Sequence, residues 1–502
     1  MTAKKNSESL IAWLPDLLYT GRRFERGRAL VCNASGAIVK VAGVDELSAE
    51  KRIRLANRAL LPGMVNAHSH AFQRVLRGRT EYRTSDKDSF WTWREMMYAA
   101  ATRLTPEDVY DASRMAFLEM ALNGITAVGE FHYLHYAPDG QPYDDPNLLA
   151  KEVVRAAGDV GLRIALLRVA YARAGFQIEP NPKQARFIEK DPESYLKNLE
   201  RLIADVSRVR SPTVREGSSP NDLDQALPDG RASAPHKNVW VGVAPHSVRA
   251  VPLDYLREVI SYANDHDLKI HMHVAEQPAE VSACVEEHGR TPVALLETEG
   301  LLSEQFTAVH AIHVTPKAIP ALARTGAMVC ACPTTERNLG DGVVPADEYL
   351  KHEVPICLGT DSHAQIDLLE DARELECHLR LQKLERAVLS VRSPRVSRGP
   401  QPGDVAALLF NCATINGARS IGAPGGTLEP GRPADFFTIA LDDPSIAGVS
   451  PDGLLASIVF SLSRAAVREV VVGGKPVVSE GQHLIQEEVV ERFNDLQKRL
   501  WS

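Results

Sequence analysis

LLPGMVNAHSH, residues 60–70, is an apolar run that ends in two histidines spaced two apart. The apolar run predicts a buried strand, and residues i and i+2 of a strand point to the same side of it. His68 and His70 would therefore face one spot at the carboxyl end of this strand. Two histidines at this spacing also occur in ordinary polar loops, so the rest of the chain has to decide between the two interpretations.

Seven more short apolar stretches follow along the chain, most of them separated by segments with helical spacing. They are GITAVGEFHY (124–133), LRIALLRVAYA (162–172), VWVGVAPHS (239–247), LKIHMHVAE (268–276), FTAVHAIHV (306–314), GAMVCACPT (326–334) and VPICLGTDSH (354–363). Eight strands that alternate with helices predict an α/β fold, a (β/α)₈ TIM-type barrel over residues 61–419. In such barrels the active site lies at the carboxyl ends of the strands.

Both ends of the chain have a different residue pattern, with short apolar runs broken by glycine, asparagine and charged residues. VREVVVGGKPVVSEGQH, for example, predicts a strand, a Gly-Gly turn and a second strand. We expect residues 1–60 and 420–502 to form one small β-sandwich domain built from both termini. The final stretch, EEVVERFNDLQKRL, predicts an amphipathic C-terminal helix within that unit.

Two segments have the composition of insertions. Residues 208–237 are poor in large apolar side chains and rich in proline, serine, glycine and aspartate, which predicts a flexible excursion before the fourth strand. Residues 386–402 carry several arginines together with prolines. We interpret them as a solvated loop, with a basic patch for a partner as the alternative.

The overall composition is that of a soluble globular protein, with 44% hydrophobic and 24% charged residues among 502. The net charge of −8 argues against a nucleic-acid partner. Seven cysteines, an odd number lying mostly in apolar runs, fit reduced thiols, and we interpret the Cys330–Cys332 pair as buried packing. Because no long apolar segment or leader is present, we expect a cytoplasmic protein without a membrane partner.

Four residues at the predicted strand ends could hold one metal ion. His68 and His70 end the first strand, His273 the fifth and Asp361 the eighth. Three imidazoles and a carboxylate suit Zn²⁺, although other first-row metals are possible. His271 shares a face with His273 but lies farther from the rim, so we interpret it as a packing or supporting residue.

Three residues near this predicted ion could move protons. A metal lowers the pKa of water, whose proton needs an acceptor, and a leaving amine needs a donor. Glu276 follows His273 by three residues, and His310 ends the core of the sixth strand. Together with Asp361 they are the candidate catalytic residues. The alternative for Glu276 is an acid at the N-terminus of the following helix.

PGMVNAHSH, HMHVAE, AVHAIHV and LGTDSH resemble the motifs of the amidohydrolase superfamily, specifically its mononuclear deaminase branch. NAHSHAFQRVLRG, FWTWREMMY, AVGEFHYLHY, APHSVRAV and ERNLGDG are similar to those members of the branch that act in histidine degradation. The resemblance covers roughly residues 60–440. It implies a hydrolase that holds one divalent ion, forms a homodimer, and converts N-formimidoyl-L-glutamate, a linear amidine, to N-formyl-L-glutamate and ammonia.

The resemblance also implies roles for individual residues. Asp361 would take a proton from water that His310 helps to hold, and Glu276 would pass a proton to the imino nitrogen. Arg94 and Arg249 would bind the two substrate carboxylates, for which the forked guanidinium group is best suited. The implied substrate pocket is completed by Gln73, Tyr133 and His246.

Three alternatives stay open at this point. A related deaminase could act on a nucleobase or on N-formimidoyl-L-aspartate, which lacks one methylene, a difference worth only about 1–3 kcal/mol in a pocket. Hydrolysis at the other C–N bond would release formamide in place of ammonia. A catalytically inactive barrel could serve as a binding scaffold, although the presence of all four candidate ligands argues for an enzyme.

Overall fold

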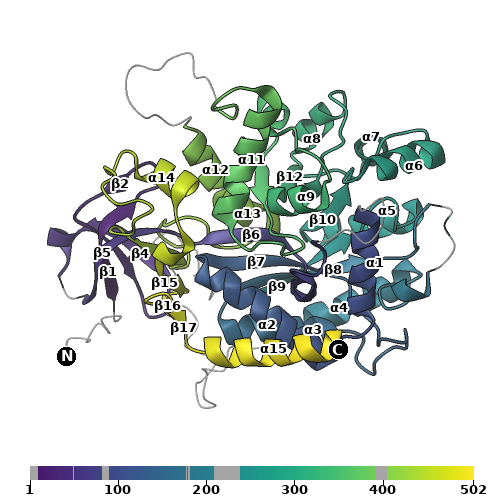
Figure 1. Ribbon diagram of the computed structural model, residues 1–502, viewed down its shortest axis with the longest axis horizontal. Helices are drawn as coiled ribbons and strands as arrows, with labels where there is room; N and C mark the ends of the chain where they lie inside the picture. The colour runs from purple at the N-terminus through teal and green to yellow at the C-terminus, as the bar shows by residue number, and fades with distance from the viewer. Residues whose placement is uncertain are drawn as a thin grey trace, which may run out of the picture.

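The computed structural model describes residues 10–48, 50–81, 90–176, 178, 181–208, 238–390 and 404–502. These residues form an eight-stranded parallel barrel and a separate nine-stranded mixed sheet (Figure 1). Apart from Arg208 and residues 386–390, the two predicted insertions lie outside the described residues. None of the helices in the described ranges is long and apolar enough to cross a membrane.

The predicted barrel and its eight strands are confirmed. The strands are β6 (Met64–Ser69), β7 (Ile125–His132), β8 (Arg163–Ala170), β9 (Val239–Pro245), β10 (Ile270–Val274), β11 (Phe306–His310), β12 (Met328–Ala331) and β13 (Ile356–Leu358). Each pairs with the next in parallel. Almost every strand residue is buried, which explains why the strands read as continuous apolar runs and not as alternating ones.

The barrel closes between its first and last strands through residues of the candidate metal site. Asp361 N donates to His68 O at 3.0 Å, and His70 N donates to Asp361 O at 3.1 Å. A side chain at Gly359 would not fit, because its Cβ would lie 2.6 Å from the Cβ of His68. The glycine of LGTDSH therefore lets the two edge strands approach closely enough to close the barrel.

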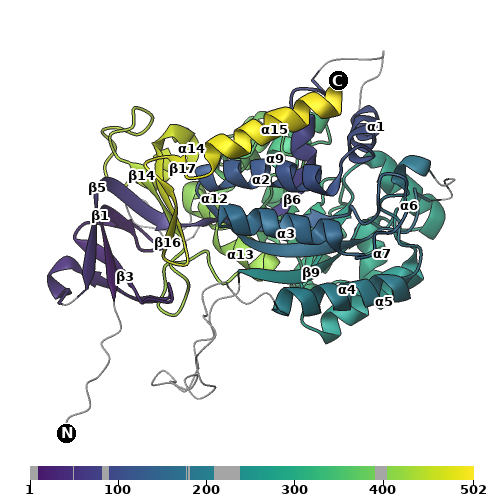
Figure 2. The same ribbon diagram turned by 90° about the horizontal axis from the view of Figure 1, so that it is seen from below.

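Helices surround the barrel, as Figures 1 and 2 show. They are α1 (Phe90–Ala101), α2 (Pro106–Leu122), α3 (Leu148–Val160), α4 (Pro192–Arg208), α5 (Leu253–Asp265), α6 (Pro278–His288), α7 (Pro292–Thr298), α8 (Ile319–Thr325), α9 (Pro333–Leu339), α10 (Ala346–Lys351), α11 (Leu368–Lys383), α12 (Val405–Ala413), α13 (Ile415–Ile421), α14 (Leu454–Ser461) and α15 (Gln486–Trp501). Several begin at sequence signals. Thr105 and Asp108, for example, form a reciprocal capping box at the start of α2.

The second sheet combines strands from both ends of the chain. It contains β1 (Ile11–Tyr19), β2 (Phe24–Glu25), β3 (Arg28–Cys32), β4 (Ile38–Gly43), β5 (Lys51–Pro62), β14 (Phe436–Ala440), β15 (Val467–Val472), β16 (Lys475–Ser479) and β17 (Gln482–His483). The expected sandwich is one continuous sheet with its own small core, in which the rings of Trp13 and Phe436 lie 5.2 Å apart. The turns at Gly36 and Gly473 touch, so the sheet curls on itself.

One predicted strand is divided between the two sheets. Residues 60–62 belong to β5 and pair with β14, whereas the barrel strand β6 begins at Met64, after Gly63. The apolar run continues across this boundary because both sheets bury it. The terminal sheet and the barrel are therefore joined directly by one extended segment.

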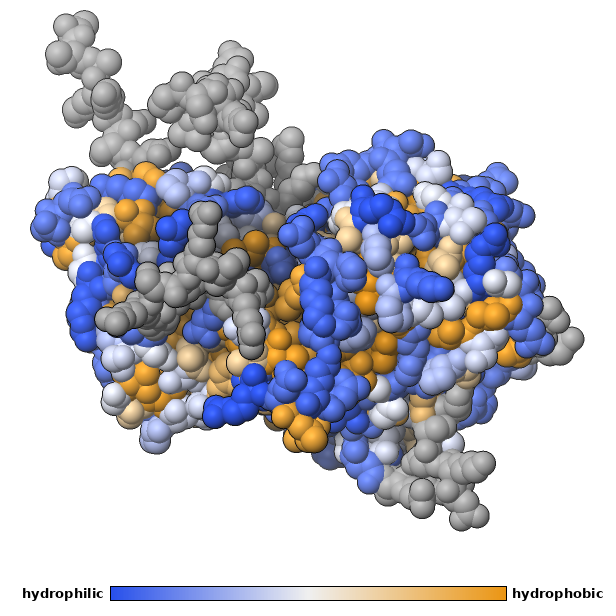
Figure 3. Space-filling model, turned by 90° about the horizontal axis from the view of Figure 1, so that it is seen from above, coloured by the Kyte–Doolittle hydropathy of each residue, from blue (hydrophilic) through white to orange (hydrophobic). Residues whose placement is uncertain are grey.

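The C-terminal helix α15 lies along α2 of the barrel (Figure 2). Arg492 pairs with Asp111 at 2.8 Å, and Arg114 pairs with Glu488 at 2.6 Å. The sequence placed this helix with the terminal sheet, but these ion pairs attach it to the barrel. Hydrophilic side chains cover most of the face shown in Figure 3, with apolar residues in smaller groups among them.

Candidate active site

The structure brings all four predicted metal ligands together at the carboxyl end of the barrel. His68 lies on β6, His70 directly follows that strand, His273 lies on β10, and Asp361 follows β13. One ligand atom from each lies within 4.8 Å of the others. The Nε2 atoms of His68 and His273 are 3.1 Å apart, and Asp361 Oδ1 lies 3.2 Å from His70 Nε2.

The chemistry of these groups fits a divalent cation. His70 Nδ1 donates to the carbonyl of Phe131 at 2.9 Å, so its Nε2 presents a lone pair to the centre. Burial lowers the pKa of His68 to about 3 and holds the pKa of His273 well below its usual range, so both rings are neutral. Neutral imidazole lone pairs and a carboxylate that converge in a buried space repel one another unless a cation lies between them. The four residues therefore fit a metal site of the nitrogen and oxygen type that Zn²⁺ accepts.

His310 lies beside this centre among three carboxylates. Its Nε2 is 3.7 Å from Glu276 Oε1 and 3.8 Å from Asp361 Oδ2, while its Nδ1 is 3.3 Å from Glu336 Oε1. Although burial opposes the charged form, these carboxylates raise the pKa of His310 to about 10. Its backbone is held at a positive φ of 67°, as is that of Asp361 at 45°, which is uncommon for residues other than glycine and typical of functional sites.

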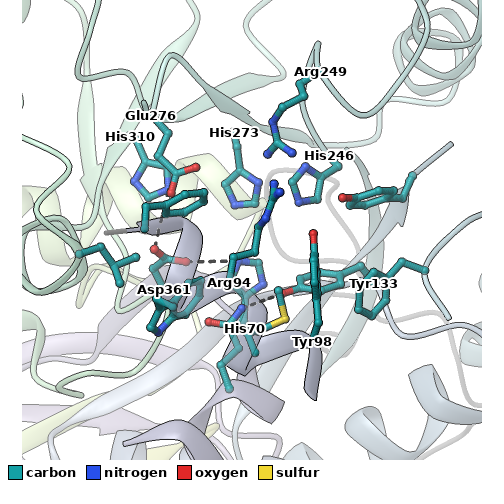
Figure 4. Close-up of a pocket in the computed structure, with 17 residues that line it drawn as sticks. His70, Arg94, Tyr98, Tyr133, His246, Arg249, His273, Glu276, His310 and Asp361 are labelled. Atoms are coloured by element: carbon teal, nitrogen blue, oxygen red, sulfur yellow. Dashed lines mark hydrogen bonds and ion pairs between the residues drawn. The ribbon is translucent and has the colours of Figure 1, made fainter. Parts of the chain in front are cut away.

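Glu276 lies just before α6, with its carboxylate turned toward His310 (Figure 4). Burial, together with the charge of nearby Asp361, raises the pKa of this carboxyl group. A different acid, Glu280 in the first turn of α6, accepts the backbone N–H groups of Ala275 and Glu276, each at 3.2 Å. The side chain of Glu276 is thus available to the centre of the pocket.

The five predicted substrate-binding residues line the same pocket as the metal centre. Arg94 comes from α1 and Arg249 from the loop after β9. Their guanidinium groups approach one another near the rings of His246 and His273 (Figure 4). Burial and the charge of Arg249 lower the pKa of Arg94. Arg249 is itself buried, and its Nη1 has no hydrogen-bond partner within the described part of the chain. Two cations in one buried pocket favour an anionic ligand.

Gln73, Tyr133 and His246 line the pocket together with the arginines and the candidate metal ligands. Gln73 Nε2 donates to Tyr133 Oη at 2.6 Å, and Gln73 Oε1 is buried with no partner among the described residues, so it can accept an N–H from a ligand. Burial and the charge of Arg249 hold the pKa of His246 well below its usual range. His246 is therefore neutral and can donate or accept one hydrogen bond.

Several groups at this site were not singled out from the sequence. Glu336 accepts from Cys332 N at 2.8 Å and lies against His310, while Tyr98 and Tyr171 line the pocket. Glu336 and Tyr98 fall in ERNLGDG and FWTWREMMY, motifs that indicated the region but not the role of each residue. His271 is directed away from the centre, with its Nε2 3.1 Å from the carbonyl of Ser420.

The cysteines make no cross-links. All seven are free, and all but Cys377 are buried. Cys332 has its sulfur near ligand atoms of His310 and Glu336. Burial raises the pKa of the Cys332 thiol well above its usual range, which favours the protonated form. The predicted role of Cys330 and Cys332 as buried packing residues agrees with their complete burial.

Comparison with known proteins places this geometry in a family. The model of the amidohydrolase family matches residues 59–477. Formimidoylglutamate deiminase of Pseudomonas aeruginosa is 35% identical over 482 residues, covering 96% of this chain and 96% of that protein. 5-Methylthioadenosine/S-adenosylhomocysteine deaminase of Haloarcula marismortui is 27% identical over 492 residues, covering 96% and 95%. The crystal structure of an amidohydrolase from Brucella melitensis is 30% identical with a TM-score of 0.83, covering 99% of this chain and all of that one.

Proposed function

Because the chain belongs to the amidohydrolase family and is a hydrolase acting on a C–N bond, we propose that it converts N-formimidoyl-L-glutamate and water to N-formyl-L-glutamate and ammonia. The observation that carries this proposal is a pair of arginines, the half-buried Arg94 and the buried Arg249, that line one pocket together with the candidate metal ligands. A substrate with two carboxylates and a hydrolysable amidine head matches both ends of that pocket. The reaction would serve histidine degradation.

We further propose that the ion is Zn²⁺, held by His68, His70, His273 and Asp361. When bound, such an ion lowers the pKa of water toward neutrality and makes hydroxide available. Other first-row metals share this chemistry. The neutral state of His68 and His273 prepares them as ligands, because a metal must otherwise displace protons from imidazolium groups.

The protein groups would act in the following order. Asp361 accepts a proton from the attacking water, whose oxygen His310 orients through a hydrogen bond. The water oxygen bonds to the formimidoyl carbon and forms a tetrahedral intermediate. Glu276, whose pKa is raised by burial, donates its proton to the imino nitrogen. Asp361 then passes the proton that it took from water to this nitrogen, the C–N bond breaks and its electron pair leaves with nitrogen as ammonia, and Glu276 takes the hydroxyl proton as the formyl C=O forms.

Binding would use the opposite wall. Arg94 and Arg249 hold the two carboxylates through charge-assisted hydrogen bonds. Gln73 Oε1 accepts an N–H of the formimidoyl group, while Tyr133 and His246 fix its plane. These contacts hold the reacting carbon next to the metal centre, which lowers the entropic part of the activation free energy of the reaction.

Product analysis tests the proposal. Purified protein of known metal content is incubated with N-formimidoyl-L-glutamate, and ammonia and formamide are quantified separately. We expect ammonia in step with substrate loss and no turnover after chelation. Formamide would show that the other C–N bond is cleaved. If protein with a full complement of metal releases neither product, this substrate is rejected. The assay is then repeated with N-formimidoyl-L-aspartate and nucleobases, the substrates of the alternative deaminases.

A further inference from the structure

Two tyrosines in the pocket wall share one buried glutamine. Tyr98 lies on α1, Tyr171 follows β8 directly, and Gln184 ends the short 3₁₀ helix Pro182–Gln184. Gln184 Nε2 is 2.9 Å from Tyr98 Oη and 2.5 Å from Tyr171 Oη and donates to both. Tyr98 and Tyr171 line the pocket, whereas Gln184 lies behind them, and none of the three is more than 2% exposed.

The direction of these hydrogen bonds determines what the tyrosines can offer to a ligand. The amide nitrogen has two hydrogens and gives one to each phenol oxygen, so neither phenolic proton is used by Gln184. A hydrogen bond between Tyr98 and Tyr171 uses at most one of the two protons. At least one phenolic O–H is therefore left to donate to whatever occupies the pocket.

The same part of the pocket holds the two arginines. The guanidinium carbon of Arg94 lies 5.5 Å from the centre of the Tyr98 ring. Figure 4 shows the hydroxyl of Tyr98 on the side of the guanidinium groups of Arg94 and Arg249. Burial raises the pKa of Tyr98, so its hydroxyl keeps its proton at neutral pH. Guanidinium groups and a phenolic O–H are all donors, so a ligand atom placed between them is best matched when it is an acceptor.

We propose that the pair Tyr98 and Tyr171 donates at least one phenolic hydrogen bond to a substrate carboxylate already held by the arginines. Gln184 acts as a positioning residue that keeps both hydroxyls in the donor direction. The inference rests on the proposed function and deepens it, because it makes the carboxylate itself the selected group. A carboxylate only accepts hydrogen bonds and satisfies this wall, whereas the NH₂ of a carboxamide would face donors and lose its partners.

Two readouts test this inference separately from the proposed reaction. The first is the KM and kcat of ammonia release from N-formimidoyl-L-glutamate. The second is the calorimetric Kd of N-formyl-L-glutamate and of its two monoamides, N-formyl-L-glutamine and N-formyl-L-isoglutamine, which requires no turnover. Wild-type protein that binds the dicarboxylate without releasing ammonia would refute the proposed function alone. Protein that neither binds nor turns over would refute both.

The variants Tyr98→Phe and Tyr171→Phe remove one donor each. We expect KM and Kd to rise about tenfold in each, with kcat nearly unchanged, because a contact made equally in ground and transition states is lost. The preference for N-formyl-L-glutamate over the monoamide that lacks the carboxylate contacted by the tyrosines should fall by the same factor. Unchanged KM and Kd in both variants would overturn the inference.

Gln184→Glu tests the positioning role. The new carboxylate has nearly the same shape but accepts both phenolic protons, so it withdraws them from the ligand. We expect its KM to match that of the Tyr98→Phe/Tyr171→Phe double variant and to rise no further when the three changes are combined. Gln482→Glu, on exposed β17 of the terminal sheet, is the matched control for an added charge. Wild-type KM in Gln184→Glu would overturn the positioning role, and failure of this variant to fold leaves the two tyrosine variants to decide the donor role.

Discussion

Arg249→Met should reduce kcat/KM for N-formimidoyl-L-glutamate by about 10- to 150-fold. The estimate follows from the structure, because Arg249 is buried and its Nη1 has no partner in the described residues, so it is available to a ligand carboxylate. Hydrogen bonds to charged groups contribute about 1.5–3 kcal/mol, and 1.4 kcal/mol is a factor of ten. Methionine retains the apolar stem but removes the charge, so most of the loss should appear in KM.

The assay pairs the variant with truncated substrates. N-formimidoyl-4-aminobutyrate lacks the α-carboxylate, and N-formimidoyl-L-2-aminobutyrate lacks the distal one. One of these two substrates lacks the carboxylate that Arg249 binds. Its kcat/KM with wild-type protein should be lower than that of the full substrate by about the same factor that Arg249→Met costs. Arg249→Met should then reduce the kcat/KM of this truncated substrate almost no further. Arg257→Met, in the exposed pair with Glu299, is the control. A loss smaller than twofold in Arg249→Met, or an equal loss with both truncated substrates, would refute the carboxylate assignment.

Three further predictions concern the centre and its support. His273→Ala should abolish both stoichiometric metal and ammonia release, as seen by metal analysis of dialysed protein, and retention of full activity would contradict the ligand set. Gly359→Ala should displace His68, because the new Cβ would lie 2.6 Å from the Cβ of His68. We therefore expect metal affinity to fall about tenfold or more. Unchanged affinity would show that the two edge strands can move apart to make room. Burial opposes ionisation of Glu189, but its pairing with Arg168 lowers the pKa of this carboxyl group to about 2. The ionised carboxylate therefore stabilises the fold above its unfolded pKa of 4.5, and this contribution is lost as the pH falls toward 2. Glu189→Gln should therefore be less stable at pH 7 and show a flatter decline of the urea midpoint between pH 5 and 2, and an unchanged pH slope would contradict the linkage.

The barrel and its metal site were predictable because both follow from local rules. Strand residues two apart share a side, and parallel strands end on one rim, so His68, His70, His273 and Asp361 had to lie near one another once eight strands were counted. The family motifs added roles for residues beyond the strands, such as Arg94 on α1, which periodicity alone does not place.

The structure differs from the sequence predictions where contacts between segments far apart in the chain determine the arrangement. Leu60 and Leu61 read as part of the barrel strand, yet they pair with Thr438 and Phe437, which lie more than 370 positions later in the chain. The amphipathic pattern of α15 predicts an apolar face but not the surface that receives it. That surface is chosen by partners such as Asp111 on α2.

The polarity of the pocket wall was the least predictable feature, and it gives the clearest account of specificity. Near the metal ligands, Asp361 and Gln73 Oε1 are acceptors, which suits the N–H groups of an amidine that becomes cationic when protonated. At the far end, Arg94 and Arg249 are donors, which suits carboxylates. A nucleobase carries no anionic group for Arg94 and Arg249 and would give up the charge-assisted hydrogen bonds that a carboxylate forms with them. Under the proposed function, these two arginines would therefore favour a carboxylate substrate over a nucleobase.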